Sequence, residues 1–251
     1  MATQGSASAV WRWASWLLLL VLWQGLSWWL ADRILPGPAA VARRIGAELG
    51  SGTLPAHLAL TLGRVLASFL LAMLAGSLLG IALARWPRLD SLLDGWVVLG
   101  LNIPALVTIV LCYIWVGLNE FAAVLAVTLN KTPTVVVLLR EGARAVDRQL
   151  LEVATVFSVA PGRCLLRVYL PQLLPYLLAA ARTGLALIWK IVLVVELLGR
   201  SNGVGFQLHL FFQLFDITGI LAYTLAFALL VVAVEGWLLR PLERRLTRWR
   251  L

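Results

Sequence analysis

Charged side chains are scarce in this sequence of 251 residues: Asp, Glu, Lys and Arg make up only 13% of it, against about 25% in ordinary globular domains. Hydrophobic residues make up 61%, and the mean hydropathy is +0.92. A water-soluble domain has no core large enough for that apolar excess. The sequence therefore predicts a membrane protein and excludes a disordered, collagen-like or disulfide-stapled chain.

Several chemical signatures are also missing. The two cysteines, Cys112 and Cys164, lie in an apolar run and in a basic loop, so we expect two free thiols. No Gly-x-x-x-x-Gly-Lys-Ser/Thr motif is present, so ATP hydrolysis would need another chain. Neither His57 nor His209 has an acid or cysteine at ligand spacing, and we expect no metal site. Nothing pairs a nucleophile with a base, so we do not expect an enzyme.

Long apolar runs dominate what is present. A membrane-spanning helix needs about 20 predominantly apolar residues. Six segments meet that requirement, and we predict one all-α, polytopic transmembrane domain over residues 1–251. The predicted spans are 13–31, 58–84, 95–118, 121–139, 173–198 and 217–239.

The distribution of basic residues predicts the orientation in the membrane. With the N-terminus inside, most of the 21 Lys and Arg residues lie on the cytoplasmic side, as the positive-inside rule requires. Both termini are then cytoplasmic, and the net charge of +9 reflects topology and contact with lipid, with no nucleic acid as a partner. Tryptophans near the span ends fit anchoring at the membrane interface.

Two connections between spans are long. Residues 32–56 contain the turn Pro36-Gly37-Pro38, followed by a stretch with helical spacing of apolar residues, which predicts a short amphipathic helix over 39–49 on the outer surface. Residues 140–171 form the other connection, on the cytoplasmic side. There we expect two short helices joined by a turn, the second opened by Pro161, which together form a docking surface.

The longer cytoplasmic connection resembles a known motif. Glu152-Val153-Ala154, with Leu170-Pro171 beginning 18 residues after the glutamate, resembles the EAA loop of binding-protein-dependent ABC importer permeases. Residues 34–38 (Ile-Leu-Pro-Gly-Pro) resemble the turn after the first span in the nitrate/sulfonate/taurine branch of that family. Arg182, Glu196 and residues 203–206 (Gly-Val-Gly-Phe) resemble that branch's fifth span and the outer loop after it.

This resemblance implies a type I ABC importer permease in a bacterial inner membrane. The implied partners are two copies of a separate ATPase, which would carry ATP and Mg, a second copy of this chain, and a periplasmic or lipid-anchored substrate-binding protein. No cofactor is expected in this chain. The loop residues implied to couple to the ATPase are Glu152, Ala154, Ser158, Gly162 and Pro171. Because Ser158 stands where the family usually has glycine, we expect Gly162 to supply the flexibility of the turn.

Polar residues inside the spans are candidates for the translocation pathway, because a charge at a helix centre costs about 2.5–3.5 kcal/mol. Lys131 lies near the bilayer midplane, beside Asn130 and shortly before Pro133. It either lines the pathway or forms a structural ion pair with an acid on another span. Asn102 and Pro104 form a second polar kink, which either lines the pathway or serves helix packing.

The fifth span adds further pathway candidates. Arg182, Trp189 and Glu196 are seven residues apart and share one helical stripe, while Lys190 points about 100° away. Extra cations suit an anion such as nitrate, bicarbonate, a sulfonate, taurine or an organic acid, although Lys190 could instead neutralise Glu196 of a second copy. The predicted function is the transmembrane subunit of an ATP-driven anion importer. A secondary transporter is the alternative, but the repeated pair of broken helices expected of one is missing.

Overall fold

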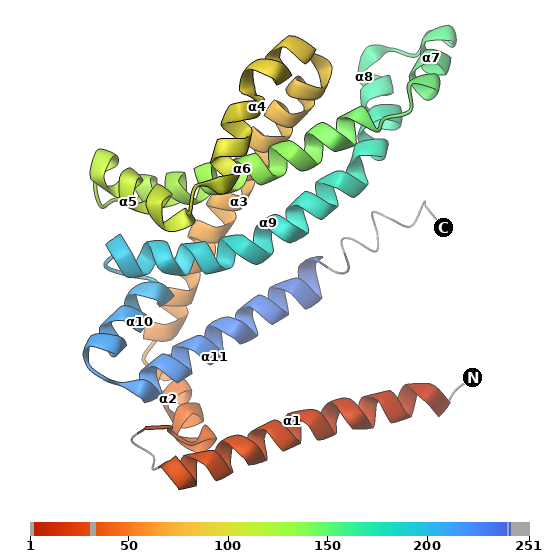
Figure 1. Ribbon diagram of the computed structural model, residues 1–251. Coiled ribbons are helices and arrows are strands. Elements are labelled where there is room, and N and C mark those ends of the chain that lie inside the picture. The colour runs from red at the N-terminus through yellow and green to blue at the C-terminus, as the bar shows by residue number, and fades with distance from the viewer. Residues whose placement is uncertain (1–2, 31–33, 240, 242–251) are drawn as a thin grey trace.

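The computed structural model describes residues 3–30, 34–239 and 241, and every regular element in them is helical (Figure 1). In chain order these are α1 (Thr3–Leu30), α2 (Pro38–Gly50), α3 (Thr53–Arg85), α4 (Pro87–Asn102), α5 (Ala105–Val116), α6 (Glu120–Arg144), α7 (Arg148–Val156), α8 (Pro161–Cys164), the π-helical turn η1 (Leu165–Tyr169), α9 (Leu170–Gly199), α10 (Val204–Gln213), α11 (Ile217–Val234) and a second π-helical turn, η2 (Glu235–Leu239).

Three long helices form the centre of the bundle. α3 packs along α6, and α6 packs along α9, while α11 packs against α10 and α2 (Figure 1). A small residue on α3 makes the first of these contacts close, because a Cβ added at Gly76 would lie 2.5 Å from the Cβ of Val135. This part of α3 therefore packs against α6 within the chain. α1 contacts the rest of the described chain mainly at α2, and its side chains are widely exposed, with Leu17 at 62%.

The described residues contain four helices long and apolar enough to cross a membrane. They are α3, α6, the continuous run from Pro161 to Gly199, and the run from Ile217 to Trp237. A fifth candidate is the bent pair of α4 and α5. The first of the six predicted spans corresponds to α1. The described apolar part of α1, Ala14–Leu30, is shorter than each of the four helices that are long enough to cross a membrane.

The third predicted span, 95–118, is broken at Asn102 and Pro104, where the sequence predicts a kink. α4 ends at Asn102, α5 begins at Ala105, and the two axes differ by 100°. Pro104 lacks the N–H that would continue the helical ladder. The break packs on the proline of α6, since a Cβ added at Gly100 would lie 2.7 Å from Cγ of Pro133.

The fifth span is longer than predicted. Pro161 does open a helix, but this helix is not short: it continues through η1 into α9 and ends at Gly199. In η1 the N–H of Leu170 donates to the carbonyl of Leu165, five residues earlier. This wider turn directly precedes Pro171, whose missing N–H would otherwise interrupt an α-helix.

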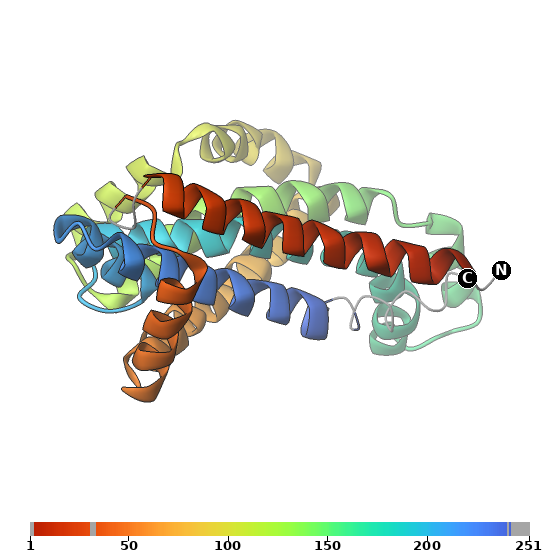
Figure 2. The same cartoon turned by 90° about the horizontal axis from the view of Figure 1, so that it is seen from below.

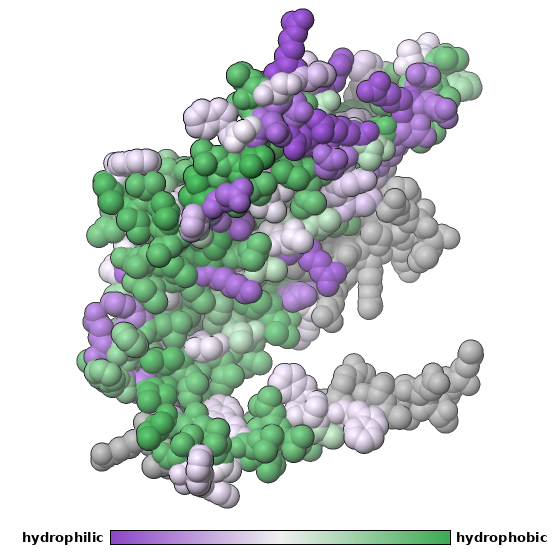
Figure 3. All heavy atoms as spheres, in the orientation of Figure 1, coloured by the Kyte–Doolittle hydropathy of each residue, from purple (hydrophilic) through white to green (hydrophobic). Residues whose placement is uncertain are grey.

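Two ends of the bundle can be distinguished. We call the end with α10 and the loop 200–203 the α10 end, and the end with α7 and α8 the α7 end. The first turn of α1 and the last turn of η2 both point toward the α7 end (Figures 1 and 2). Apolar side chains cover most of the middle of the visible face, and polar ones gather around α7 and where α4 meets α6 (Figure 3).

The amphipathic helix predicted over 39–49 is confirmed as α2. Pro38 lies at its start, and Val41 is buried at 1% exposure. The two cysteines are free thiols, as predicted.

Candidate functional site

A groove runs between α9 and α11. Its volume is about 490 Å³, and its walls include Arg182, Trp189 and Lys190 from α9 and Thr224, Phe227 and Glu235 from α11 and η2. We call it the α9–α11 groove. The rings of Trp189 and Phe227 meet edge to face, with centroids 5.7 Å apart and planes at 77°. The predicted pathway residues Arg182, Trp189 and Lys190 therefore lie in one groove. The sequence did not predict that α11 and η2 would form the opposite wall.

The other pathway candidates lie elsewhere. Asn102 is exposed at the end of α4, where its amide Nδ2 donates to the carbonyl of Val98 at 2.7 Å. Asn130 is half-buried on α6. Neither residue is part of the α9–α11 groove.

Lys131 is buried on α6, at 8% exposure. One turn to either side, Val127 and Val135 belong to two different apolar clusters, so the hydrophobic core is interrupted at the level of the lysine. No hydrogen bond or ion pair joins Lys131 to any residue in the part of the chain that the structure describes. The described residues therefore do not support the alternative that Lys131 forms an ion pair with an acid on another span of the same chain.

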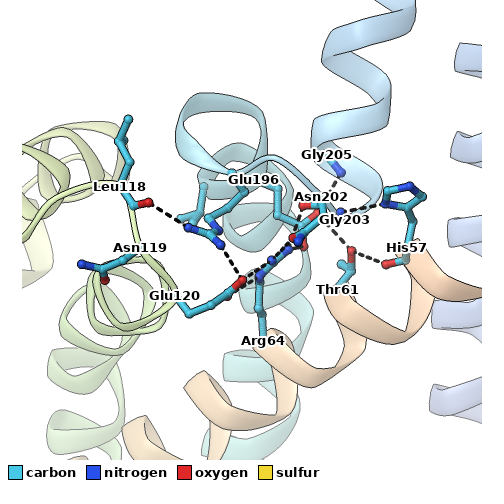
Figure 4. A network of polar contacts seen from close by, with 12 residues as sticks. His57, Thr61, Arg64, Leu118, Asn119, Glu120, Glu196, Asn202, Gly203 and Gly205 are labelled. Carbon is cyan, nitrogen blue, oxygen red and sulfur yellow. Dashed lines mark hydrogen bonds and ion pairs between the residues drawn. The ribbon is translucent and has the colours of Figure 1, made fainter.

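Glu196 does not share the groove with Arg182 and Trp189, although the three residues have helical spacing. It is fully buried (0% exposed) and turned toward α3, where its Oε1 accepts from Nη1 of Arg64 at 2.6 Å and its Oε2 accepts from Oγ1 of Thr61 at 3.0 Å (Figure 4). Arg64, not Lys190, supplies its counter-charge. Burying a carboxylate requires a partner charge and hydrogen bonds, and α3 provides both.

Arg64 uses every N–H of its guanidinium. Nε and Nη2 donate to the two carboxylate oxygens of Glu120 at 2.8 and 2.6 Å, and Nη1 donates to Glu196 and to the backbone carbonyl of Asn202 at 3.0 Å. Nη2 also donates to the side-chain oxygen of Asn202. The side chain of Arg64 is only 5% exposed. One cation thus links α3, the first turn of α6, α9 and the loop 200–203.

The first turn of α10 explains the Gly-Val-Gly-Phe motif. The N–H of Gly205 donates to Oε2 of Glu196 at 2.8 Å, and the N–H of Val204 donates to Thr61 at 2.9 Å. The N–H of Gly203 donates to Nδ1 of His57 at 2.9 Å (Figure 4). Gly203 has φ of +103° and lies against the Glu196 carboxylate. Any other residue here would be strained at this φ, and its side chain would collide with the carboxylate.

We call this set the Arg64 network, consisting of His57, Thr61, Arg64, Glu120, Glu196 and Asn202. Of its members the sequence singled out only Glu196 as a site residue. Arg64 could have been recognised as a cation on an apolar helix, but its partners are 56 and 132 residues away along the chain. Among the described residues, no group of three or more His, Cys, Asp or Glu side chains could hold a metal ion.

A second ionic cluster lies at the α7 end, between α4 and α6. Nη1 of Arg140 donates to Asp90 at 2.9 Å and to Asp94 at 2.7 Å, and Arg144 pairs with Asp90 at 2.5 Å. The side chain of Asp94 is 52% exposed and that of Arg144 is 44% exposed. This cluster is therefore partly hydrated, as is Glu120 at the edge of the Arg64 network, whereas Arg64 and Glu196 themselves are buried.

α7 presents an apolar face to the outside. Its buried side includes Ala154, at 7% exposure, while Glu152 is exposed. Asp147 caps its first turn by accepting from the N–H of Gln149, and the N–H of Asp147 donates to the side chain of Gln172 on α9 at 2.8 Å. The helix is thus attached to the transmembrane part. The exposed apolar residues are Leu150 (49%), Val153 (50%), Val156 (81%) and Phe157 (77%).

In the turn after α7, Ser158 has a positive φ of 49°, although the family usually has glycine at this position. The N–H of Val159 donates to the carbonyl of Ala154, and the N–H of Ser158 donates to that of Thr155, both at 2.9 Å, which is the Schellman pattern. Gly162 lies inside α8 and does not make the turn. The expectation that Gly162 would take over this role is wrong, because the paired hydrogen bonds fix the left-handed residue at 158.

A family model matches most of this chain. The model describes binding-protein-dependent transport system inner membrane components, and it matches residues 72–248. The matched region includes α4 to α11 and therefore the α9–α11 groove, α7 and Glu196.

Individual relatives cover nearly the whole chain. It is 29% identical to a Bacillus subtilis protein named as an aliphatic sulfonates transport permease, over 93% of this chain and 85% of that protein. It is 28% identical to the taurine transport system permease of Escherichia coli, over 88% and 85%. It is 33% identical to the riboflavin transport system permease of Chloroflexus aurantiacus, over 93% and 87%.

The fold also matches a solved structure. A chain of an amino acid ABC transporter with histidines superposes with a TM-score of 0.64 at 18% identity, covering 80% of this chain and 97% of that one. At this identity the match concerns the fold alone.

Proposed function

This chain belongs to the family of binding-protein-dependent transport system inner membrane components and is the permease component of an ABC transporter, and we propose that two copies of it form the translocation pathway of an ATP-driven importer. Permeases of this family have no catalytic activity of their own. Membership in a binding-protein-dependent system also implies an ATPase and a binding protein as partners, and it removes the reason to consider a secondary transporter.

The exposed face of α7 is the observation that carries the proposal. A small helix with Val156 and Phe157 about four-fifths exposed, fixed to the bundle at Asp147, is suited to insertion into a groove of another protein. We assign this face to the ATPase, with Glu152 at its edge and Ala154 as its packed support. In this assignment Ser158 forms the turn after α7. Gly162 and Pro171 belong to the long helix that would transmit a movement of the ATPase from α7 to α9.

The orientation follows from the same assignment. If α7 docks on a cytoplasmic ATPase, the α7 end is cytoplasmic, and the first turn of α1 and η2 lie on that side. The α10 end then faces the binding protein. ATP and Mg would bind to the ATPase, and this chain would need no cofactor of its own. Closure of the two ATPases would rotate the bundle and change which side the pathway opens to.

We assign the pathway to the α9–α11 groove and its surroundings. Arg182, Trp189 and Lys190 lie in the groove, and Lys131 lies in the core without a partner in the described chain. Asn102 and Asn130 lie outside this groove and remain candidates. Glu196 is reassigned to the Arg64 network, where it positions the α10 end. The relatives are named for sulfonates, taurine and riboflavin, so the proposal of an anionic substrate rests on the cations of this chain.

Charge reversal in α7 tests the importer function. Glu152→Arg should abolish copurification with the partner ATPase in lipid and lower ATP turnover at least about tenfold, because a reversed charge at a docking face costs several kcal/mol. Glu141→Arg is the matched control, since Glu141 is also exposed at the α7 end but belongs to α6. Normal association and turnover of Glu152→Arg would refute the docking assignment.

A further inference from the structure

His57 is half-buried near the start of α3, at the α10 end, and both of its ring nitrogens have polar neighbours. Nδ1 accepts a hydrogen bond from the backbone N–H of Gly203 at 2.9 Å (Figure 4), and Nε2 lies 2.8 Å from the side-chain amide of Gln207. A backbone N–H can only donate, so Nδ1 carries no proton. The imidazole is therefore neutral, and its single N–H lies on Nε2, where the amide of Gln207 can turn its oxygen to accept it.

Three successive backbone N–H groups, those of residues 203–205, attach the start of α10 to the bundle. Their acceptors are the ring of His57, the hydroxyl of Thr61 and the carboxylate of Glu196. The hydroxyl remains an acceptor at any pH, and the carboxylate is paired with Arg64 at 2.6 Å. Only the imidazole changes from acceptor to donor when it binds a proton near neutral pH. His57 is thus the one acceptor of the three that a mild change of pH can remove.

Protonation of His57 is incompatible with this arrangement. The added N–H on Nδ1 would point at the N–H of Gly203, so two donors would face each other across the 2.9 Å that a hydrogen bond now spans. Gly203 cannot yield by moving toward α9, because it already lies against the carboxylate of Glu196. The contact is relieved only if the ring and the loop 200–203 separate.

Charged and titratable groups approach His57 from several elements. Glu48 of α2 favours a cationic ring, whereas Arg64 of α3 opposes it. Glu48 already pairs within α2 at 3.2 Å and accepts from the hydroxyl of Tyr223 on α11, whose ring centroid lies 6.4 Å from that of His57. α9 contributes Glu196, which Arg64 neutralises. Both of these acids are thus engaged elsewhere, and neither replaces the hydrogen bond that a protonated ring would lose.

We propose that His57 is a pH switch, whose protonation releases the loop 200–203 and the first turn of α10 from α3. The hydrogen bond to Gly203 is present while the ring is neutral, above the ordinary histidine pKa of about 6.5, and is lost as the pH falls below it. The opening is local, because Arg64 still joins Glu120 to Glu196.

The regulatory meaning of this switch rests on the proposed function. With α7 on the cytoplasmic side, the α10 end faces the outer medium, and the acidity of that medium then controls the surface assigned to the binding protein. The switch itself depends only on the contacts of His57, so it can be tested apart from transport.

Hydrogen–deuterium exchange of the full-length chain in phosphatidylcholine nanodiscs measures the release. Mass spectrometry follows peptides that cover residues 199–210 at about pH 5.5 and about pH 7.5, with labelling times corrected for the intrinsic effect of pH on exchange. We expect the amides of residues 203–205 to be protected about tenfold less at the lower pH, since about one pH unit below its pKa the ring is mostly protonated. Peptides from the middle of α6 should be equally protected at both pH values, which separates local opening from unfolding.

Two variants of His57 remove the titration in different ways. His57→Asn offers an amide oxygen near the position of Nδ1, so we expect high protection at both pH values. His57→Phe offers no acceptor, and protection should be low at both. His209→Asn is the matched control, because His209 is the other histidine of the sequence and its ring bonds within α10, to Gln213 at 2.8 Å. This control should keep the pH dependence of the wild type.

The pH dependence decides the proposal. Its loss in both His57 variants supports the switch, whatever the level of protection they share. Equal protection of the wild type at the two pH values would overturn it, as would a pH dependence that survives in either His57 variant or disappears in His209→Asn. The assay contains no ATPase and reads the same contacts whichever side the α10 end faces. Failure here therefore differs from failure of the docking assignment, which Glu152→Arg tests.

Discussion

Arg64 and Lys131 are both buried cations inside the helix bundle, at 5% and 8% exposure, yet their surroundings differ completely. Arg64 uses all of its N–H groups on Glu120, Glu196 and Asn202. Lys131 has no hydrogen bond or ion pair within the described part of the chain. A cation with every donor satisfied fixes a structure, whereas an unpartnered one lowers stability and is retained only where it serves another purpose. We therefore expect opposite responses to their removal.

The largest effect is expected for Arg64→Met. The variant leaves Glu196 buried without a counter-charge, which costs about 3–5 kcal/mol, and it frees the loop that precedes α10. Unfolding in detergent, followed by circular dichroism against denaturant, measures the change. Arg43→Met on the exposed face of α2 is the control and should unfold like the wild type. An unchanged midpoint for Arg64→Met would mean that the network does not support the fold.

A smaller loss is expected for Thr61→Val. The hydroxyl of Thr61 donates to Glu196 and accepts from the N–H of Val204, so its removal leaves buried groups unsatisfied at a cost of about 1–3 kcal/mol. Thr183→Val is the matched control, because the Thr183 hydroxyl is exposed and bonds only within its own helix. Equal unfolding midpoints for the two variants would contradict the assigned role of Thr61.

A still smaller loss is expected at the ionic cluster of the α7 end. Asp94→Asn weakens an ion pair with Arg140 whose acid is 52% exposed, and such pairs contribute about 0–1 kcal/mol. The difference from the wild type should shrink further in 0.5 M salt, since exposed charges are screened. A loss as large as that of Arg64→Met would show that the two clusters are equivalent.

The smallest effect on stability is expected for Lys131→Met, which should unfold like the wild type or slightly later, because it removes a buried charge that has no partner in the described chain. In the complete transporter the same variant should lose ATP turnover stimulated by substrate and binding protein. Strong destabilisation would instead show that Lys131 has a structural partner, and normal transport would remove it from the pathway.

Local signals in the sequence explain which features could be predicted. Pro36 to Pro38 and the spacing of Val41 and Ile45 predicted α2, and Pro161 predicted the start of α8. Each of these signals acts within a few residues of the chain.

Features that depend on distant partners were missed or misassigned. Helical spacing placed Glu196 on a stripe with Trp189, but the carboxylate turns toward Arg64, 132 residues earlier in the chain. Helix spacing indicates which residues share a stripe, and it does not indicate what each side chain meets.

The sequence by itself determined that this chain lies in a membrane, that it is helical, and which loop resembles a permease docking motif, because hydropathy and short motifs depend on residue type and local spacing. Only the tertiary structure decided which buried charges are paired, how sharply the third span bends, and that Arg182, Trp189 and Lys190 share a groove with α11. Those outcomes depend on how α3, α6, α9 and α11 approach one another. A buried charge is stabilised only by groups that the folded chain brings within a few ångströms, and in the Arg64 network these groups come from four separate segments.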